Sequence, residues 1–577
     1  MRADLRALAA MALLLVTALA YRLVGRAGFV WDDDAYVVQN ALLTEPGGLG
    51  RIWSEPAASP QYYPVVFSSF WLEARLWGSG PETGAGYHLT NLALHGATAL
   101  LLWGLLGRLL RPREGPVLPG AGAVAYAGAL LFALHPVGVE SVAWVSERKN
   151  VLSAVFALLA ARAWVAFSPP EEDLPLRARD WRAYALALAA FALALLSKSV
   201  TATLPGALLV LCWWRRGRVS GREVLALAPF ILLGAVAGLH TAWLEAHHVG
   251  AGGGPFRLAP AERLVLAGRA PWEYLRRLAL PLGLSFYYPR FSLALARGWP
   301  FVLGTPALLV GLWAARRQLG RGPLAATLVF GGTLFPVLGF VDVYPFRFSW
   351  IADHFQYHAM AAALTLAAAA LAAAVARLTP SGPRRRLGFG LALGALAGAL
   401  SFLTQQRARA FEDYEALLRD TLSHAPDCWI AHANLAQLLA ARGEGEQAFA
   451  HLARAVALEP RDERNQLNLG RALLRRGRAG EAVRALAEAV RLNPRWPLAR
   501  FDLTRALLAA GRPAEAARVA LELLREQQPG LVDPALLGLL RRVQGALRRG
   551  DPLAQEVERE LGVWFANPWP GGPPQER

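Results

Sequence analysis

The sequence predicts an all-α protein in two parts, a polytopic membrane helix bundle of about eleven spans followed by a soluble α-solenoid. Three observations support this fold class. Of the 577 residues, 55% are hydrophobic, and they cluster into long apolar runs, as in membrane proteins. Basic residues gather in every second connection between these runs. The last third of the chain repeats with a constant period.

Eleven stretches have few or no charged residues, and each approaches the roughly 20 residues that a helix needs to cross the hydrocarbon layer. The first of them also resembles a secretory signal, but we interpret it as a retained span because many spans follow it. The stretches are residues 5–20, 94–107, 120–134, 150–167, 183–196, 201–214, 224–239, 301–315, 324–341, 359–376 and 387–403.

The net charge of +17 does not require a nucleic-acid partner, because the basic residues sit mostly in short loops and on repeat surfaces. The positive-inside rule makes the basic connections cytoplasmic. We therefore expect an inner (cytoplasmic) membrane protein, with its C-terminal part on the periplasmic or extracytoplasmic side. The connections expected outside are 26–86, 138–149, 197–200, 243–298, 341–355 and everything after 405.

Residues 261–280 are a difficulty for this topology. They have a helical pattern but carry six charged residues, too many for a helix that faces lipid. An amphipathic helix on the outer membrane surface explains them best. The sequence leaves open whether this segment spans the membrane or lies on it.

The C-terminal section, residues 406–564, has the 34-residue period of the tetratricopeptide repeat. Pro426, Pro460 and Pro494 mark the period. The glycines at 443, 477 and 511 keep the same phase and predict the turn within each helix pair, whereas the prolines end the second helix. Residues 531–564 are expected to cap the stack, and residues 565–577 to form a disordered tail. Such a stack offers a groove for peptides, although a rigid lid or a dimer contact would share the pattern.

Three consecutive acids, Asp32, Asp33 and Asp34, follow the first span directly. Adjacent carboxylates repel one another and raise the pKa of at least one member, which suits a site that takes a proton or a cation. A solvated acidic turn or a helix N-cap would have the same sequence.

Further ionisable residues lie beside predicted spans, where they are costly unless they face water or partners. The alternatives are interfacial anchoring by aromatic residues, snorkelling of Lys and Arg, and helix capping. The segments are residues 134–150, with His135, Glu140, Glu147, Arg148 and Lys149; Leu196–Thr201, with Lys198; Leu280–Pro289; and residues 344–358, with Asp353 and His354.

The order of these segments resembles one family. The motifs are Asp-Asp after the first span, Leu-His-Pro-x-x-x-Glu-x-Val-x-Trp, Ser-Lys, Pro-Leu-x-Leu-Ser-x-Tyr-Tyr-Pro and Ala-Asp-His-Phe-x-Tyr, followed by tetratricopeptide repeats. The chain resembles, over nearly its whole length, the transmembrane-and-tetratricopeptide O-mannosyltransferases and their bacterial relatives. Those proteins are glycosyltransferases of the GT-C fold. The resemblance therefore implies a GT-C-like transmembrane domain at residues 1–405.

The resemblance implies transfer of a sugar, such as mannose, from a polyprenyl-phosphate donor to a protein Ser or Thr outside the membrane. The chemistry needs a carboxylate base and cations for the departing phosphate. The catalytic candidates are Asp32, Asp33, His135 and Glu140; the substrate-binding candidates are Arg148, Lys149, Lys198, Asp353 and His354.

The expected partners are a lipid-linked sugar donor and a protein or peptide acceptor bound in the tetratricopeptide groove, with no nucleic acid. The acidic loop leaves the use of a divalent cation open. The alternative function is a non-catalytic, membrane-anchored scaffold for assembly of an envelope complex, whose ionisable residues would tolerate replacement by Ala.

Overall fold

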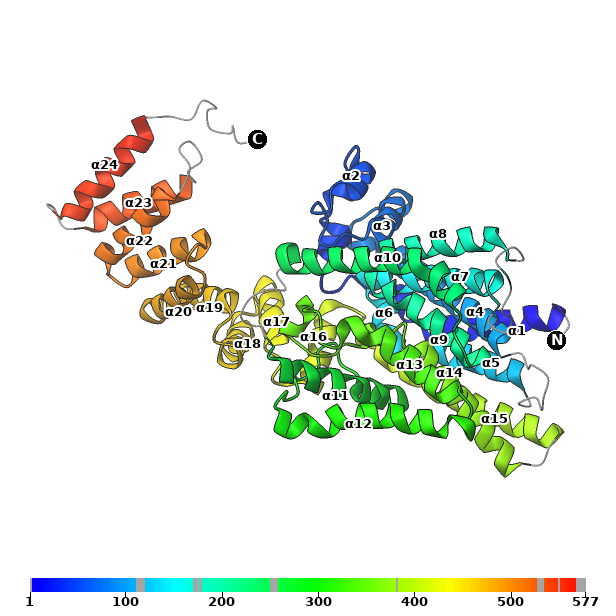
Figure 1. Ribbon diagram of the computed structural model, residues 1–577. Helices are drawn as coiled ribbons and strands as arrows, with labels where there is room; N and C mark the ends of the chain where they lie inside the picture. Colours follow the sequence, from blue (N-terminus) through cyan, green and yellow to red (C-terminus); the bar gives the residue numbers. More distant parts are fainter. Residues whose placement is uncertain are drawn as a thin grey trace. The chain divides into compact units, whose positions relative to one another are not determined.

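The chain folds into two helical units, Met1–Ala425 and Pro426–Arg577, in the computed structural model shown in Figure 1. The structure describes residues 3–110, 120–169, 175, 179–249, 258–379, 382–526, 534–547 and 551–566, and these contain no β-strand. From residue 567 on, the predicted tail lies outside the described residues. The predicted class, an all-α membrane bundle followed by a repeat solenoid, is confirmed.

The first unit consists of long helices that pack side by side. Within it α7 runs along α8, α5 along α14, and α11 along α12. The helices are α1 (Ala3–Ala20), α2 (Gly48–Ser54), α3 (Pro64–Trp77), α4 (Gly84–Leu109), α5 (Ala121–Leu134), α6 (Val139–Ala143), α7 (Arg148–Phe167), α8 (Trp181–Ser197), α9 (Leu204–Arg216), α10 (Gly221–Leu244), α11 (Pro260–Ala279), α12 (Leu295–Ala314), α13 (Gly322–Leu334), α14 (Met360–Leu378), α15 (Pro383–Arg409) and α16 (Tyr414–His424).

Local sequence signals explain several of these boundaries. The Asp180 side chain accepts hydrogen bonds from Arg182 N and Ala183 N and so begins α8. Ser220 and Glu223 form a capping box at the start of α10. Gly217, with φ of 81°, ends α9 in the left-handed conformation that glycine adopts without a steric cost.

The prediction of about eleven spans is wrong in number. Six helices of the described residues are long and apolar enough to cross a membrane, or seven if the pair 121–134 and 136–143, bent by 51°, counts as one. Several apolar stretches form helices of 13 to 17 residues instead, namely α8, α9 and α13. At 1.5 Å per residue such helices reach only about 20 to 25 Å, less than the hydrocarbon thickness of about 30 Å. Hydropathy records apolar composition, but Pro and polar residues decide where a helix stops.

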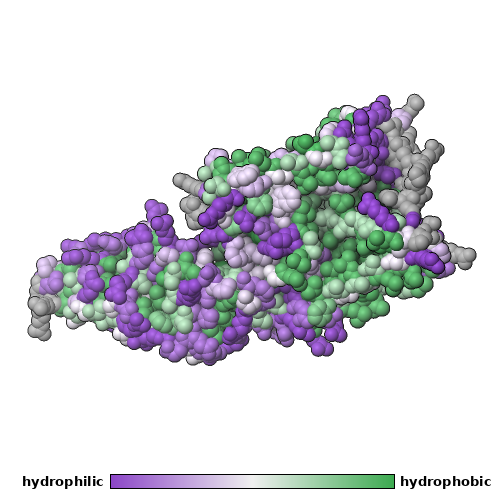
Figure 2. Space-filling view, turned by 90° about the horizontal axis from the view of Figure 1, so that it is seen from below, coloured by the Kyte–Doolittle hydropathy of each residue, from purple (hydrophilic) through white to green (hydrophobic). Residues whose placement is uncertain are grey.

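The surface of the first unit is that of a multi-pass membrane protein. Figure 2 shows green, hydrophobic surface over much of this unit, whereas the repeat unit is largely purple. Large apolar side chains remain exposed along the outside of α10 and α12, including Leu225, Leu239, Leu303 and Val310. Apolar patches of this extent are rare on soluble monomers and suit contact with lipid.

Most of the predicted site residues lie in or directly beside short helical turns, whereas Arg148 and Lys149 begin the long helix α7 and Glu140 lies in α6. These turns lie at breaks between longer helices, where side chains of several elements can meet. The turns are η2 (Asp34–Val38), η5 (Pro136–Gly138), η6 (Val145–Glu147), η8 (Ser199–Thr203) and η14 (Asp353–Gln356).

The second unit is a stack of helix pairs. Its first helices α17, α19 and α21 alternate with the second helices α18, α20 and α22, and Gly443, Gly477 and Gly511 join them with φ of 82°, 74° and 70°. The small residues Ala482 and Ala516 are fully buried between helices. The helices are α17 (Trp429–Ala441), α18 (Gly445–Leu458), α19 (Glu463–Arg475), α20 (Ala479–Leu492), α21 (Pro497–Ala509), α22 (Pro513–Arg525), α23 (Pro534–Ala546) and α24 (Pro552–Ala566).

Candidate functional site

The acidic turn after α1 separates its three carboxyl groups. Trp31 takes a positive φ of 54°, which is unusual for a bulky residue and is a strained conformation. Its ring is held between Phe286, Tyr287, Phe348 and Tyr414. After this turn Asp33 is buried, Asp32 is half-buried and Asp34 is exposed.

Asp33 fastens two loops to each other. One carboxyl oxygen accepts a hydrogen bond of 2.7 Å from Ser146 N, and the other accepts one of 3.0 Å from Val30 N. Burial raises the pKa of Asp33 to about 8, and the neighbouring charge of Asp32 adds to this rise. The raised pKa favours the protonated form of Asp33, and its two hydrogen bonds hold Val30 and Ser146 on one carboxyl group.

Asp32 is the half-buried member of the acidic turn. Its Oδ1 accepts hydrogen bonds from Trp144 Nε1 at 3.0 Å and from Ser146 Oγ at 2.5 Å. Desolvation raises the pKa of Asp32, and the Lys149 ammonium opposes that rise. A carboxylate whose pKa lies above the usual range is a better general base near neutral pH than an unperturbed one.

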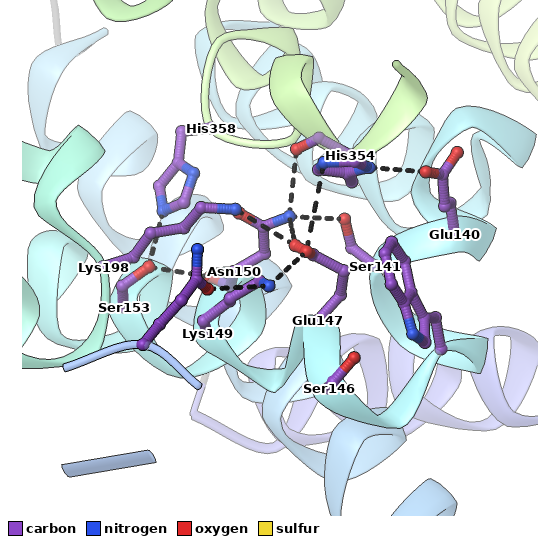
Figure 3. Close-up of polar contacts among 12 residues, drawn as sticks. Glu140, Ser141, Ser146, Glu147, Lys149, Asn150, Ser153, Lys198, His354 and His358 are labelled. Carbon is purple, nitrogen blue, oxygen red and sulfur yellow. Dashed lines mark hydrogen bonds and ion pairs between the residues drawn. The ribbon is translucent and has the colours of Figure 1, made fainter. Parts of the chain in front are cut away.

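A buried cluster centred on Glu147 lies next to this turn. Lys149 Nζ is 2.9 Å from Glu147 Oε1, and Lys198 Nζ is 3.1 Å from Oε2 (Figure 3). Asn150 Nδ2 also donates to Oε2, at 2.7 Å. Residues from α7 and from the break between α8 and η8 thus meet on one carboxylate.

His354 connects this cluster to two further acids, Glu140 and Asp353. Its Nδ1 lies 2.5 Å from Glu140 Oε1, and its Nε2 lies 4.0 Å from Glu147 Oε1. Asp353 accepts a hydrogen bond of 2.9 Å from the hydroxyl of Tyr288. Burial raises the pKa of Asp353 to about 7, and the nearby Glu140 carboxyl adds to the rise.

Two of the predicted site residues, Arg148 and His135, are bound by groups of the surrounding scaffold. Arg148 is fully buried; it forms an ion pair with Glu73 and donates to Asn91 Oδ1 at 2.8 Å and to the Tyr87 carbonyl at 2.7 Å. His135 Nε2 contacts the Leu278 carbonyl at 3.0 Å, and its Nδ1 accepts from Val137 N.

The structure therefore brings together Asp32, Lys149, Lys198, Glu140 and His354, with Asp353 next to His354 in the chain and close enough to Glu140 for their charges to interact. Glu147 is the centre of the cluster. The Leu-His-Pro-x-x-x-Glu-x-Val-x-Trp motif contains Glu140 but ends before Glu147. A signal was present: a second Glu directly beside Arg148 and Lys149 in a mostly apolar region needs cationic partners. Glu73 and Asn91, the partners of Arg148, have no comparable signal, because they come from α3 and α4.

The described ranges contain no group of three or more His, Cys, Asp or Glu side chains that could hold a metal ion.

A cavity of about 980 Å³ runs between α4, α5, α7, α9, α13 and α14. Leu, Ala and Val side chains form most of its wall. Val200, Thr201 and His358 line it as well. Val200 and Thr201 follow Lys198 in the chain, and His358 Nε2 lies 3.0 Å from Ser153 Oγ, one turn along α7 from Lys149. The polar cluster therefore adjoins this apolar space.

Known proteins share parts of this sequence. The tetratricopeptide repeat family matches residues 439–498 and 473–543. Protein O-mannosyl-transferase TMTC4 of Mus musculus is 32% identical over 145 residues, which are 23% of this chain and 19% of that protein. Protein O-mannosyl-transferase F38B6.6 of Caenorhabditis elegans is 31% identical over 142 residues, with the same shares.

The match thus spans about a fifth of the length of these relatives. The resemblance to the transmembrane-and-tetratricopeptide O-mannosyltransferases is confirmed as a sequence similarity. Among solved structures, the crystal structure of ArnT from Cupriavidus metallidurans bound to undecaprenyl phosphate is 16% identical, with a low TM-score of 0.33, and covers 99% of this chain and 90% of that one.

Proposed function

We propose that this protein is a membrane glycosyltransferase that moves a sugar from a polyprenyl-phosphate donor to a hydroxyl group of a protein. The observation that carries the proposal is the pairing of a base with phosphate-binding cations around Trp144. The Trp144 Nε1 atom donates to Asp32, and the Lys149 ammonium lies 5.6 Å from the centre of the Trp144 ring. Lys198 shares the Glu147 carboxylate with Lys149, so a carboxylate and two lysines lie within reach of one substrate.

Asp32 is the proposed general base. The acceptor oxygen forms a bond to the anomeric carbon of the sugar while its proton passes to Asp32. The bond from this carbon to the phosphate oxygen breaks, and its electron pair leaves with the phosphate. Asp32 is suited to this step because it is half-buried and has a free oxygen, whereas both oxygens of Asp33 are engaged by backbone N–H groups.

Lys149 and Lys198 are the proposed phosphate ligands. Charge that develops on a leaving phosphate is stabilised most by fixed cations in a site with little water. Both ammonium groups are held in place, because Glu147 binds them at 2.9 and 3.1 Å. Arg148 instead fixes α7 to α3 and α4 through Glu73 and Asn91.

The apolar cavity supports a lipid-linked donor. With about 980 Å³ and a wall of mostly aliphatic side chains, it suits part of a branched hydrocarbon chain. Its position beside His358 and Thr201 lets a lipid tail lie there while the attached phosphate reaches Lys198. Mannose as the sugar and a protein as the acceptor are taken from the relatives' names, and Ser or Thr as the acceptor residue from the family resemblance.

The tetratricopeptide unit is the proposed acceptor-binding part. Repeat stacks present extended concave surfaces for peptides and partner proteins. We place this unit and the candidate site on the same, extracytoplasmic side of the inner membrane.

A transfer assay tests the proposal. Membranes that contain the full chain are incubated with radiolabelled polyprenyl-phosphate mannose, and label in protein is measured. We expect the Asp32→Asn variant to lose about 100-fold or more of the activity, the usual contribution of a general base.

Asp34→Asn is the matched control, because Asp34 is the exposed member of the same acidic turn. It should keep near wild-type activity. Full activity in Asp32→Asn would contradict the assignment of the base, and a wild-type protein inactive with polyprenyl-phosphate sugars would contradict the proposed function.

A further inference from the structure

Glu147 occupies the position where a phosphate group would be expected. Three nitrogen groups bind its carboxylate: the Lys149 ammonium at 2.9 Å, the Lys198 ammonium at 3.1 Å and the Asn150 amide at 2.7 Å. Glu147 itself is 1% exposed. Two ammonium groups and an amide on neighbouring oxygens of one anion are a donor set that phosphate oxygens also accept.

Both lysines are therefore already paired. A phosphate can bind them only if it displaces the Glu147 carboxylate or shares the lysines with it. We propose that Glu147 is an internal competitor of the lipid phosphate, which holds the two lysines in place before the donor arrives and takes them back after transfer. This inference rests on the proposed glycosyltransferase function, because that function supplies the phosphate.

The reaction makes such a competitor useful. The donor phosphate is a diester with one negative charge, whereas the polyprenyl phosphate that leaves is a monoester with a charge approaching −2 at neutral pH. Two buried lysines would therefore hold the product more tightly than the donor. A carboxylate that competes for the same ammonium groups weakens product binding and speeds its release, a step that often limits turnover.

The surroundings provide an alternative partner for the displaced carboxylate. His354 Nε2 is 4.0 Å from Glu147 Oε1, while His354 Nδ1 lies 2.5 Å from Glu140. Asn150 also donates to Ser141 Oγ and to the His354 carbonyl, so its amide stays in place. Figure 3 shows the His354 ring beside the Glu147 carboxylate. Glu147 can therefore keep Asn150 and turn toward His354 when a phosphate takes the lysines.

Binding of undecaprenyl phosphate to the purified full chain in detergent tests the inference. If Glu147 competes with phosphate, Glu147→Gln should bind this lipid about tenfold more tightly, since the competing charge is removed. Its steady-state turnover should fall, with a burst of the first product. If Glu147 only positions the lysines, the same variant should bind the lipid more weakly, so unchanged or weaker binding overturns the inference.

Glu245→Gln is the matched control. Glu245 is also a buried carboxylate and also feels the charges of Lys149 and Lys198, but its hydrogen bonds come from Gln61 and the Tyr344 backbone N–H and not from the lysines. Lipid binding to this variant should stay within about twofold of wild type; equal tightening by both variants would overturn the specific role of Glu147.

A second variant and a second ligand complete the test. If Glu147→Gln fails to fold, Glu147→Asp keeps the charge but is too short to reach both lysines, and it should also tighten lipid binding. Inorganic phosphate in place of the lipid should bind far more weakly, because it leaves the cavity empty, and equal affinities would overturn the lipid assignment. Binding needs no sugar transfer, so a missing transferase activity would contradict the proposed function without deciding this result.

Discussion

Two adjacent aspartates receive different environments from the fold. Asp33 points inward and binds two backbone N–H groups, whereas Asp32 remains half-buried beside Ser146 and Trp144. The sequence shows two equivalent acids. Only their burial separates a positioning residue from a proposed base.

Asp33 should also make stability depend on pH. Its pKa rises from the ordinary value of 3.8 to about 8 in the folded protein. Between these values the folded state holds a proton that the unfolded state has lost, so raising the pH lowers stability, by up to about 1.4 kcal/mol per pH unit. The pKa of Asp353, raised to about 7, acts in the same direction.

We expect the melting temperature of the detergent-solubilised protein to fall between about pH 5 and about pH 8. Asp33→Asn should flatten this slope, because an amide does not ionise. The exposed Asp34→Asn variant should keep the wild-type slope. An unchanged slope in Asp33→Asn would show that Asp33 is already ionised in the folded state.

At the scale of helices and turns, the candidate site forms where long apolar helices are interrupted. The bundle interrupts its apolar segments at His135-Pro136, at Ser197-Lys198 and before Met360, and each break carries site residues or their supports. His135 stabilises the first break through the Leu278 carbonyl and Val137 N. Shorter helices therefore replace several of the expected spans where the site is built.

Close packing of a helix pair gives a prediction for the repeat unit. A Cβ atom on Gly470 of α19 would lie 2.4 Å from Leu486 Cγ of α20, and Leu486 is fully buried. Gly470→Ala should therefore destabilise the unit by about 1 to 3 kcal/mol through overpacking. Urea unfolding of a fragment of residues 426–577, which has its own hydrophobic core, followed by circular dichroism, measures the loss.

Gly480 of α20 is the control position for this experiment. A Cβ atom there meets nothing within 4 Å, so Gly480→Ala should be neutral or stabilise by up to about 1 kcal/mol. Equal effects of both substitutions would contradict the packing argument.

At the scale of the whole molecule, the membrane topology decides on which side of the membrane each part lies. The basic connections predict a cytoplasmic N-terminus and an extracytoplasmic repeat unit. An alkaline phosphatase fused after Arg577 should therefore be active, because this enzyme folds only outside the cytoplasm. A fusion after Gly217, within the basic connection that follows α9, should be inactive. The reverse pattern would separate the repeats from the proposed site and overturn this arrangement.

The sequence by itself determined the two-part helical class and the repeat period. Both depend on patterns that are local in the sequence, namely apolar runs and a 34-residue spacing. These patterns do not depend on tertiary contacts. It also pointed to most of the ionisable residues that lie together in the candidate site, since ionisable residues beside membrane spans are rare and costly.

Only the tertiary structure decided which of these residues lie together. Asp32 follows α1, Glu147 precedes α7, Lys198 follows α8 and His354 precedes α14, so their distances are set by packing across the whole bundle. The same packing buried Arg148 against Glu73 and placed Glu147 between two lysines. Burial and ion pairing depend on neighbours that are distant in sequence, and no local pattern records them.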